Sequence, residues 1–110
     1  MANTYKSAQL QGTAALSTYG SLYFTGAATT AIISSIVVCN TSASAVLFRV
    51  GLMGTAGTPS ASEFIVYDAS LAGNDTIALT LGLTMGNSQF LRVSSSANTL
   101  AFYAAVGEIS

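Results

Sequence analysis

The sequence predicts an all-β protein: a single antiparallel β-sandwich, jelly-roll or immunoglobulin-like, of about seven or eight strands with an N-terminal arm. Its apolar runs are short and rich in Ile, Val and Phe, which favours strands over helices. Clusters of Gly, Asn, Asp and Ser that favour turns separate most of these runs. No segment repeats its apolar residues at the period of a helix. The length of 110 residues suits one core and one domain.

Residues 1–20 are predicted to form an N-terminal arm, followed by a sandwich domain at residues 21–110. The arm alternates Ala, Gln, Ser, Thr and Gly without a sustained apolar face, and its best strand candidate is Tyr5–Gln11. Terminal segments are ordered only where something holds them. We therefore expect the arm to reach a neighbouring subunit. Deleting residues 2–15 is then expected to change the melting temperature of the isolated domain little.

The centre of the predicted domain is Ala31–Val50. Two apolar runs, Ile32–Cys39 and Val46–Val50, flank the polar residues 40–44. Asn and Ser side chains bond to nearby backbone and favour a turn, so the sequence predicts a β-hairpin. A period of two places Val46, Phe48, Val50 and Leu52 on one face of its second strand. Arg49 then points the other way, toward solvent or a partner.

The other strands follow from alternation and turn signals. Ser21–Phe24 is predicted to be a short strand before a turn at residues 26–28, and Glu63–Tyr67 another strand. The clearest alternation predicts one strand that points Ile77, Leu79, Leu81, Leu83 and Met85 into the core. Its opposite face is small and uncharged, which suits close packing by another sheet or subunit. The last two strands are Gln89–Ser94, with Leu91 and Val93 on one face, and Thr99–Val106, with Leu100, Phe102, Ala104 and Val106 inward.

Charge is scarce throughout the sequence. Charged residues make up 6% of the chain, against about 25% in an ordinary soluble domain. Hydroxyls, amides, glycine and alanine must therefore cover the surface, and a surface with net charge −1 promotes association. We predict a homo-oligomer or a subunit of a larger assembly. No basic patch supports nucleic-acid binding, and no apolar run is long enough to cross a membrane.

The sequence gives no basis for catalysis or for a cofactor. It contains no histidine, which excludes Ser-His-Asp triads and histidine metal sites. Asp68 and Asp75 could flank a calcium ion, but we expect each to cap a turn. Glu63 and Glu108 could form a glycosidase-like pair, but nothing in their surroundings favours it. The single cysteine, Cys39, is expected to be a small buried residue.

The five tyrosines are the only aromatic residues with a polar tip. They could lie at the edges of the core, anchor subunit interfaces, where tyrosine is enriched, or line a carbohydrate site. We take as candidate interface residues Tyr5, Lys6, Tyr19, Tyr23, Arg49 and Arg92.

The order of short motifs along the chain resembles a family of small virion structural proteins of tailed bacteriophages, described as tail, fibre or decoration components. The motifs are Tyr5-Lys6, Leu22-Tyr23 before the turn at 26–30, Ile33–Asn40, Phe48-Arg49-Val50, Tyr67-Asp68, Asn74-Asp75-Thr76, Leu79–Leu83 and Gly107–Ser110. They cover nearly the whole chain. The family usually has a proline in the turn before the central strand, where this chain has Gly26-Ala27-Ala28.

The resemblance implies a non-enzymatic protein of the virion. We expect a capsid decoration (cement) protein that binds as a homotrimer and contacts the major capsid protein or other virion proteins, with no cofactor, nucleic acid or membrane. A tail, baseplate or fibre-associated protein is the alternative within this class. A module that binds carbohydrate on a host surface is the alternative of another class, and tyrosines converging at one loop end would favour it.

Overall fold

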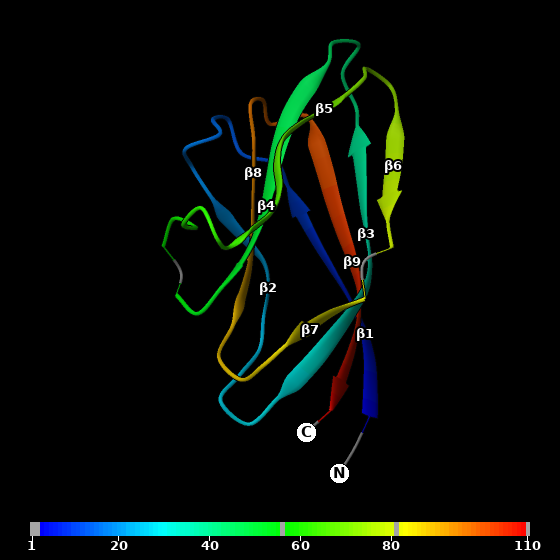
Figure 1. Cartoon of the computed structure of the whole chain (residues 1–110). Coiled ribbons are helices and arrows are strands. Elements are labelled where there is room, and N and C mark those ends of the chain that lie inside the picture. The colour runs from blue at the N-terminus through cyan, green and yellow to red at the C-terminus, as the bar shows by residue number, and fades with distance from the viewer. Residues whose placement is uncertain (1–2, 56, 81, 110) are drawn as a thin grey trace.

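The computed structural model describes residues 3–55, 57–80 and 82–109, and within them the chain forms nine strands in two layers (Figure 1). The strands are β1 (Asn3–Gln11), β2 (Gly20–Phe24), β3 (Thr30–Asn40), β4 (Val46–Met53), β5 (Phe64–Leu71), β6 (Thr76–Leu79), β7 (Leu83–Met85), β8 (Phe90–Ser95) and β9 (Leu100–Ile109). The prediction of an all-β antiparallel sandwich is confirmed.

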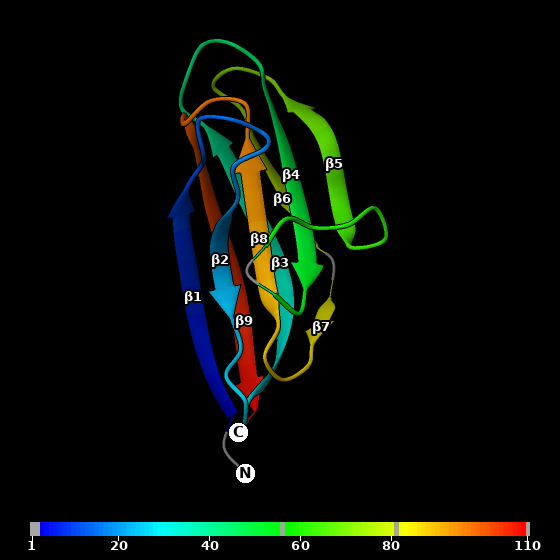
Figure 2. The same ribbon diagram turned by 90° about the vertical axis from the view of Figure 1, so that its left-hand side faces the viewer.

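The strand order identifies the sandwich as jelly-roll-like rather than immunoglobulin-like. The five-stranded sheet has the order β1-β9-β3-β6, with β7 also paired to β3, and the four-stranded sheet has the order β2-β8-β4-β5. The pairs are therefore nested along the sequence: β1 pairs with β9, β2 with β8, β3 with β7, and β4 with β5. This nested antiparallel pairing is that of one long hairpin rolled into two layers. Figure 2 shows the layers stacked, with β2 and β8 in front of β9 and β3.

The core lies between the inner faces of the two sheets. Buried apolar side chains alternate along the strands, as the sequence predicts for β8 and β9. Phe48 of β4 and Phe102 of β9 meet edge to face across the layers, with ring centroids 6.1 Å apart. The other core side chains include Ile33, Ile36, Val38, Val50, Leu71, Met85, Leu91, Val93, Leu100, Ala104 and Val106.

The predicted hairpin at Ala31–Val50 is wrong, although both of its strands exist. β3 lies in the five-stranded sheet and β4 in the four-stranded sheet, so residues 41–45 cross from one layer to the other. The buried side chain of Asn40 organises this crossing. Its amide nitrogen donates to the carbonyl of Ser44 at 2.8 Å and to the carbonyls of Leu71 and Ala72 at 3.2 Å. The local turn preference of Asn and Ser is thus satisfied without pairing the two strands.

Bulges in β5 shift its register against β4. Val46, Phe48 and Val50 are buried as predicted, but the register against β5 shifts between Phe48 and Gly51. Leu52 packs partly buried against the core, on the predicted face, whereas Met53 is buried but lies outside the core cluster. Asp68 lies within this bulged stretch of β5, between Val66 and Ala69, and adopts a positive φ of 52°.

Gly73 allows two loops to meet at one end of the sandwich. A Cβ atom at this position would overlap the backbone carbonyl of Ala43, and the amide of Asn74 donates to the carbonyl of Ser42 at 2.8 Å. Backbone on both sides leaves no flexible group to move aside. We expect Gly73→Ala to lower the free energy of unfolding by about 3 kcal/mol in chemical denaturation. Gly54→Ala is the matched control, because a Cβ there has open space, and equal losses would contradict this account.

The single strand predicted at Ile77–Met85 is divided into β6 and β7. Both pair with β3, but Gly82 between them has a φ of +60°, which interrupts the extended chain. Met85 is buried, and Ile77, Leu79 and Leu83 pack half-buried against the core. Leu81, predicted to point into the core, lies outside the described residues. The opposite face is small and uncharged, and its residues Thr76, Ala78 and Thr84 are exposed in the single chain.

The predicted arm contains an integral strand. β1 includes the candidate Tyr5–Gln11 and pairs antiparallel with β9 over nine residue pairs. Ala8 and Leu10 pack against the core, and the amide of Gly12 donates to the carbonyl of Leu100 at 2.7 Å. The expectation that this segment takes its order from a neighbouring subunit is therefore corrected, because its own sheet holds it. A single edge strand with one half-buried face shows little apolar pattern in the sequence.

Candidate functional site: two outer faces

The outer face of the five-stranded sheet carries no charged side chain among the described residues. Four strands contribute mostly small, hydroxyl or apolar groups, and no loop crosses them in Figure 1, where this sheet lies to the right. We call this surface the uncharged face. Its residues are Tyr5, Ser7, Gln9 and Gln11 of β1, Ala101, Tyr103, Ala105, Gly107 and Ile109 of β9, Ile32, Ser34, Ser35, Val37 and Cys39 of β3, and Thr76 and Ala78 of β6.

A hollow of about 550 Å³ opens in the uncharged face above Gly107. Register places Tyr5 of β1, Gly107 of β9 and Ile32 of β3 in one row across three strands. The glycine leaves the middle of this row empty, and a Cβ there would meet only the Tyr5 ring, at 3.9 Å. Tyr5 is 86% exposed and Ile32 47%, so two apolar ridges flank an apolar depression.

A second hollow of about 430 Å³ lies further along the same face, lined by Gln9, Gln11, Val37 and Ala101 among others. Tyr103 borders both hollows. Cys39 also lines the second hollow and is half-buried, so the expectation of a buried cysteine is wrong. The error arises because Cys39 occupies an outward position on β3.

Lys6 and Tyr23 meet at Glu108 at the edge of the sandwich, where Lys6 and Glu108 also form part of the lining of the first hollow. The ammonium of Lys6 lies 3.0 Å from one Glu108 oxygen, and the Tyr23 hydroxyl donates to the other oxygen. Because Tyr23 comes from the four-stranded sheet and Glu108 from the five-stranded sheet, the carboxylate ties the two layers together. Half of the Lys6 side chain stays exposed.

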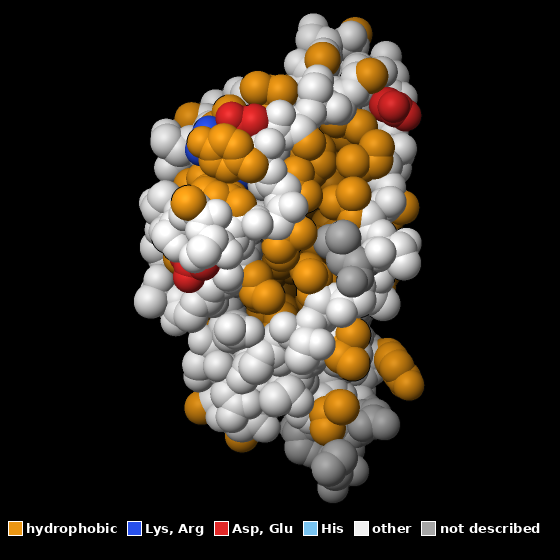
Figure 3. All heavy atoms as spheres, viewed as in Figure 1, with side chains coloured by type: hydrophobic (Ala, Val, Ile, Leu, Met, Phe, Trp, Pro, Cys, Tyr) orange, Lys and Arg blue, Asp and Glu red, His pale blue; other side chains and the backbone are white. Residues whose placement is uncertain are grey.

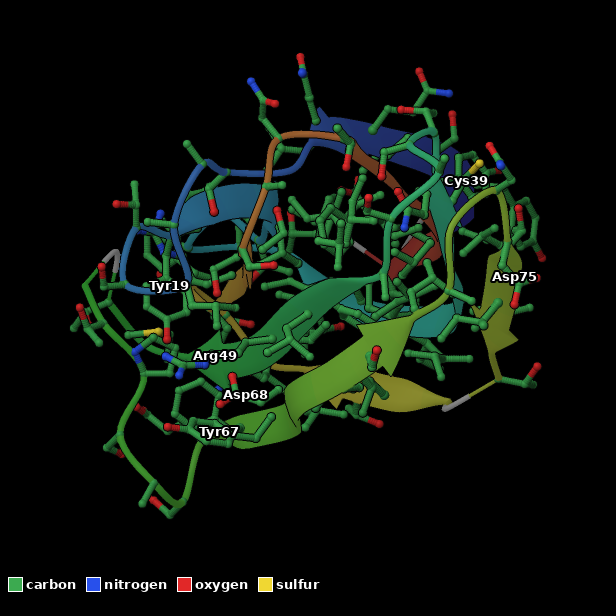
Figure 4. The ribbon with its side chains drawn as sticks, turned by 90° about the horizontal axis from the view of Figure 1, so that it is seen from above. Tyr19, Cys39, Arg49, Tyr67, Asp68 and Asp75 are labelled. Carbon is green, nitrogen blue, oxygen red and sulfur yellow. The ribbon has the colours of Figure 1, made fainter. Side chains whose placement is uncertain are left out.

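The outer face of the four-stranded sheet has the opposite character. Figure 4 shows Arg49 between Tyr19, Tyr67 and Asp68. Its guanidinium donates to both Asp68 oxygens, at 2.5 and 3.3 Å, and to the Tyr19 hydroxyl at 3.2 Å. The guanidinium carbon lies 4.3 Å from the centre of the Tyr67 ring. We call these four residues the arginine cluster.

The arginine cluster fixes a permanent charge. The hydrogen bond that Arg49 donates to Asp68, followed by the one that it donates to Tyr19, raises the pKa of Arg49 further above its already high ordinary value. A raised pKa means that the contribution of this pair to stability is present at neutral pH and is lost only as the pH rises through the pKa of Arg49. The guanidinium therefore stays charged wherever the protein is folded.

Replacing Arg49 with lysine is expected to lower the melting temperature, because an ammonium cannot make the forked contact to Asp68 while also reaching Tyr19. Asp68→Asn is expected to lower it too, and the double variant to fall no further than Arg49→Lys alone. Thermal unfolding followed by circular dichroism measures all three. Additive losses would contradict the coupling.

Arg92 reinforces the same region. It donates to the Ser21 hydroxyl at 2.7 Å and to the carbonyl of Tyr19 at 3.2 Å. Together, Arg49 and Arg92 tie the loop between β1 and β2 to the four-stranded sheet. Loop residues also cover the end of β4, where Pro59 lies against Gly51. This outer face is therefore both charged and partly covered by its own chain.

The candidate interface residues thus separate into two groups. Tyr5, Lys6 and Tyr23 lie around the first hollow and its edge, whereas Tyr19, Arg49 and Arg92 lie on the opposite outer face. Sequence reasoning missed Ile32, Gly107 and Ile109. The alternation in β9 could have indicated this face. Its outward residues Ala101, Tyr103, Ala105 and Gly107 alternate with the predicted core residues and are small or uncharged.

The acidic residues have separate partners. Asp68 contacts Arg49, and Asp75 accepts from the amide of Thr76, on the other side of the molecule in Figure 4. Glu63 accepts from the amide of Ser60 at 2.8 Å, whereas Glu108 contacts Lys6 and Tyr23. Within the described residues no group of three His, Cys, Asp or Glu side chains could hold a metal ion. The same residues include no helix long and apolar enough to cross a membrane.

One edge of the sandwich is open. Figure 3 shows apolar side chains in the gap between the two layers, where β5 and β6 form the borders. The partly buried apolar residues of these edge strands are Ile65, Val66, Ala69, Ile77 and Leu79. At the opposite edge β1 and β2 contact each other and close the sandwich.

Comparison with known proteins finds the same fold in solved structures. No protein-family profile and no curated protein matches the sequence. Among solved structures, a chain of the T13 viral particle of infectious bursal disease virus (IBDV) superposes with a TM-score of 0.57 at 11% identity. A chain of the Gx strain of the same virus gives 0.56 at 12% identity. Each match covers 96% of this chain, which spans only 30% and 32% of the two viral chains. This likeness establishes the fold: the chain has the jelly-roll-like β-sandwich of one part of a virus-particle protein.

Proposed function

We propose that this chain is a structural component of a bacteriophage virion, and specifically a capsid decoration (cement) protein that stabilises the shell through oligomeric surface contacts. The observation that carries the proposal is the uncharged face. Four strands present hydroxyl, amide and apolar groups there without a charged side chain among the described residues. Such a surface favours a protein partner over water and leaves nothing to attract nucleic acid.

The fold and the sequence motifs support the same class. The chain shares its jelly-roll-like fold with part of a virus-particle protein, and its motifs resemble those of small tailed-phage virion proteins. A cement protein acts by burial: each contact is weak, and the repetition of the contact over a shell multiplies its effect. The resemblance implies a homotrimer, with the major capsid protein or other virion proteins as partners.

The positions of the tyrosines favour assembly over carbohydrate binding. Tyr5 and Tyr103 border the first hollow, Tyr23 lies at the sandwich edge, and Tyr19 and Tyr67 lie on the four-stranded sheet. A carbohydrate site needs aromatic and polar groups that converge on one concavity. Here they are distributed over three separate places.

Particles made with and without the chain test the proposal. We expect particles without it to release their nucleic acid at a lower temperature, as measured by the fluorescence of a dye that binds nucleic acid, and added purified protein to restore the release temperature. Electron microscopy of decorated particles is expected to place the protein on the outer surface of the head. Density only on the tail would support the tail or baseplate alternative, and absence of the protein from purified particles would overturn the proposal.

A further inference from the structure

We propose that the uncharged face is a self-association surface whose occupant is the uncharged face of a second copy, related by a two-fold axis. The inference deepens the proposed function and rests on it, because it names the contact between copies in the assembly. It derives from three observations: the charge of each surface, the size of the face, and its relief.

Charge selects the second copy and the face that it presents. Burying an unpaired charge in an interface is costly, so a surface without charge requires a partner surface without charge. The outer face of the four-stranded sheet carries Arg49, Asp68 and Arg92 and is partly covered by loop residues. Of the two outer sheet faces in the described part of a second copy, its uncharged face is thus the one that complements the uncharged face of the first copy. Contact between identical patches on two copies has two-fold symmetry.

The size of the face is adequate for a stable contact. Four strands spaced about 4.8 Å apart, each about nine residues long with a rise of about 3.3 Å per residue, give a flat area of about 600 Å². The accessible area of a surface with ridges and hollows exceeds its flat area. Standard protein interfaces bury about 800 Å² on each partner, so two such faces approach the standard size.

The relief of the face is self-complementary. The exposed side chains Tyr5 and Ile32 stand as ridges on either side of the hollow above Gly107. A two-fold rotation brings the ridges of one copy to the hollow of the other. Tyrosine and isoleucine then gain apolar contact area, while the surrounding Ser, Thr and Gln groups supply hydrogen bonds at the rim. This contact is distinct from the three-fold contact that the phage resemblance implies, so an assembly containing it has an even number of chains.

A matched pair of charge substitutions tests the surface. Ile32→Glu places a carboxylate in the uncharged face, whereas Leu47→Glu places one on the four-stranded sheet, and both side chains are exposed strand residues, 47% and 37% respectively. We expect the unmodified chain to form dimers, twice the 11.1 kDa of one chain, or larger even-numbered assemblies, in light scattering at high micromolar concentration. Ile32→Glu is expected to raise the dissociation constant at least about 100-fold, and Leu47→Glu to leave it within about threefold.

Gly107→Val is a second variant that separates association from folding. The backbone there tolerates a Cβ with only ordinary contact to Tyr5, and valine favours strands. The melting temperature is therefore expected to hold or rise. Filling the hollow is expected to raise the dissociation constant by about tenfold.

Three results would overturn the inference: a monomer at high micromolar concentration, a trimer whose mass Ile32→Glu leaves unchanged, or equal weakening by Ile32→Glu and Leu47→Glu. If Ile32→Glu leaves self-association unchanged but abolishes binding to particles, the uncharged face meets the shell, and the proposed function stands without this inference. If dimers form as expected but the protein is absent from particles, the proposed function fails and the self-association surface remains.

Discussion

Deleting residues 2–15 is expected to abolish cooperative folding, because the deletion removes all of β1 from the five-stranded sheet. β9 would lose nine residue pairs of backbone hydrogen bonding, and the core would lose the packing of Ala8 and Leu10. The deletion would also expose the edge of β9, whose side chains Phe102 and Ala104 lie in the core. The loss is expected to equal or exceed about 5 kcal/mol, which is comparable to the whole stability of a small domain.

Circular dichroism during thermal unfolding measures the effect of this deletion, with size-exclusion chromatography to detect aggregation. The control is Tyr5→Ala within the intact chain, because the Tyr5 side chain is 86% exposed and its removal leaves the strand in place. A truncated protein that still melts cooperatively near the temperature of the intact chain would show that β1 is dispensable, as the sequence pattern alone suggested.

Replacing Phe48 with alanine is expected to lower the free energy of unfolding by about 3–5 kcal/mol. Phe48 is fully buried and packs edge to face on Phe102, so the two rings join the sheets at the centre of the core. Truncation removes this contact and leaves a cavity that the stiff strands on either side cannot close. Urea denaturation measures the difference.

Phe24→Ala is the matched control for Phe48→Ala. Phe24 also stacks on a phenylalanine, Phe90, with centroids 4.3 Å apart, but it is 46% exposed and lies outside the core. Its loss is expected to cost about 1 kcal/mol or less. Comparable losses for the two variants would mean that the edge-to-face pair at the centre of the sandwich carries no special weight.

The sequence by itself determined which residues face inward wherever a strand alternates cleanly. In β9, Leu100, Phe102, Ala104 and Val106 are all buried, and in β8 Leu91 and Val93 are. This success has a simple physical reason: side chains of an extended chain alternate between its two faces, so the apolar set must point to the core. The alternation fails where the backbone is irregular, as at Gly82 and at Ser34 and Ser35 of β3, where the register against β9 shifts.

Pairing between strands was decided only by the tertiary structure. Residues 40–44 have the composition of a hairpin turn, yet β3 and β4 lie in different sheets. A turn preference acts over a few residues, whereas the choice of partner depends on burying both apolar faces of the whole chain at once. The same reason gave β1 its place beside β9, at the other end of the sequence.

The candidate site divides in the same way. Composition alone determined that the surface is poor in charge, because seven charged residues cannot cover a 110-residue domain. Only the folded sheet places Arg49, Asp68 and Arg92 on one outer face and leaves the outward strand positions of the other without a charge among the described residues. Tyr5, Ile32 and Gly107 lie far apart in the sequence and become one row because strand register, a non-local property, aligns them.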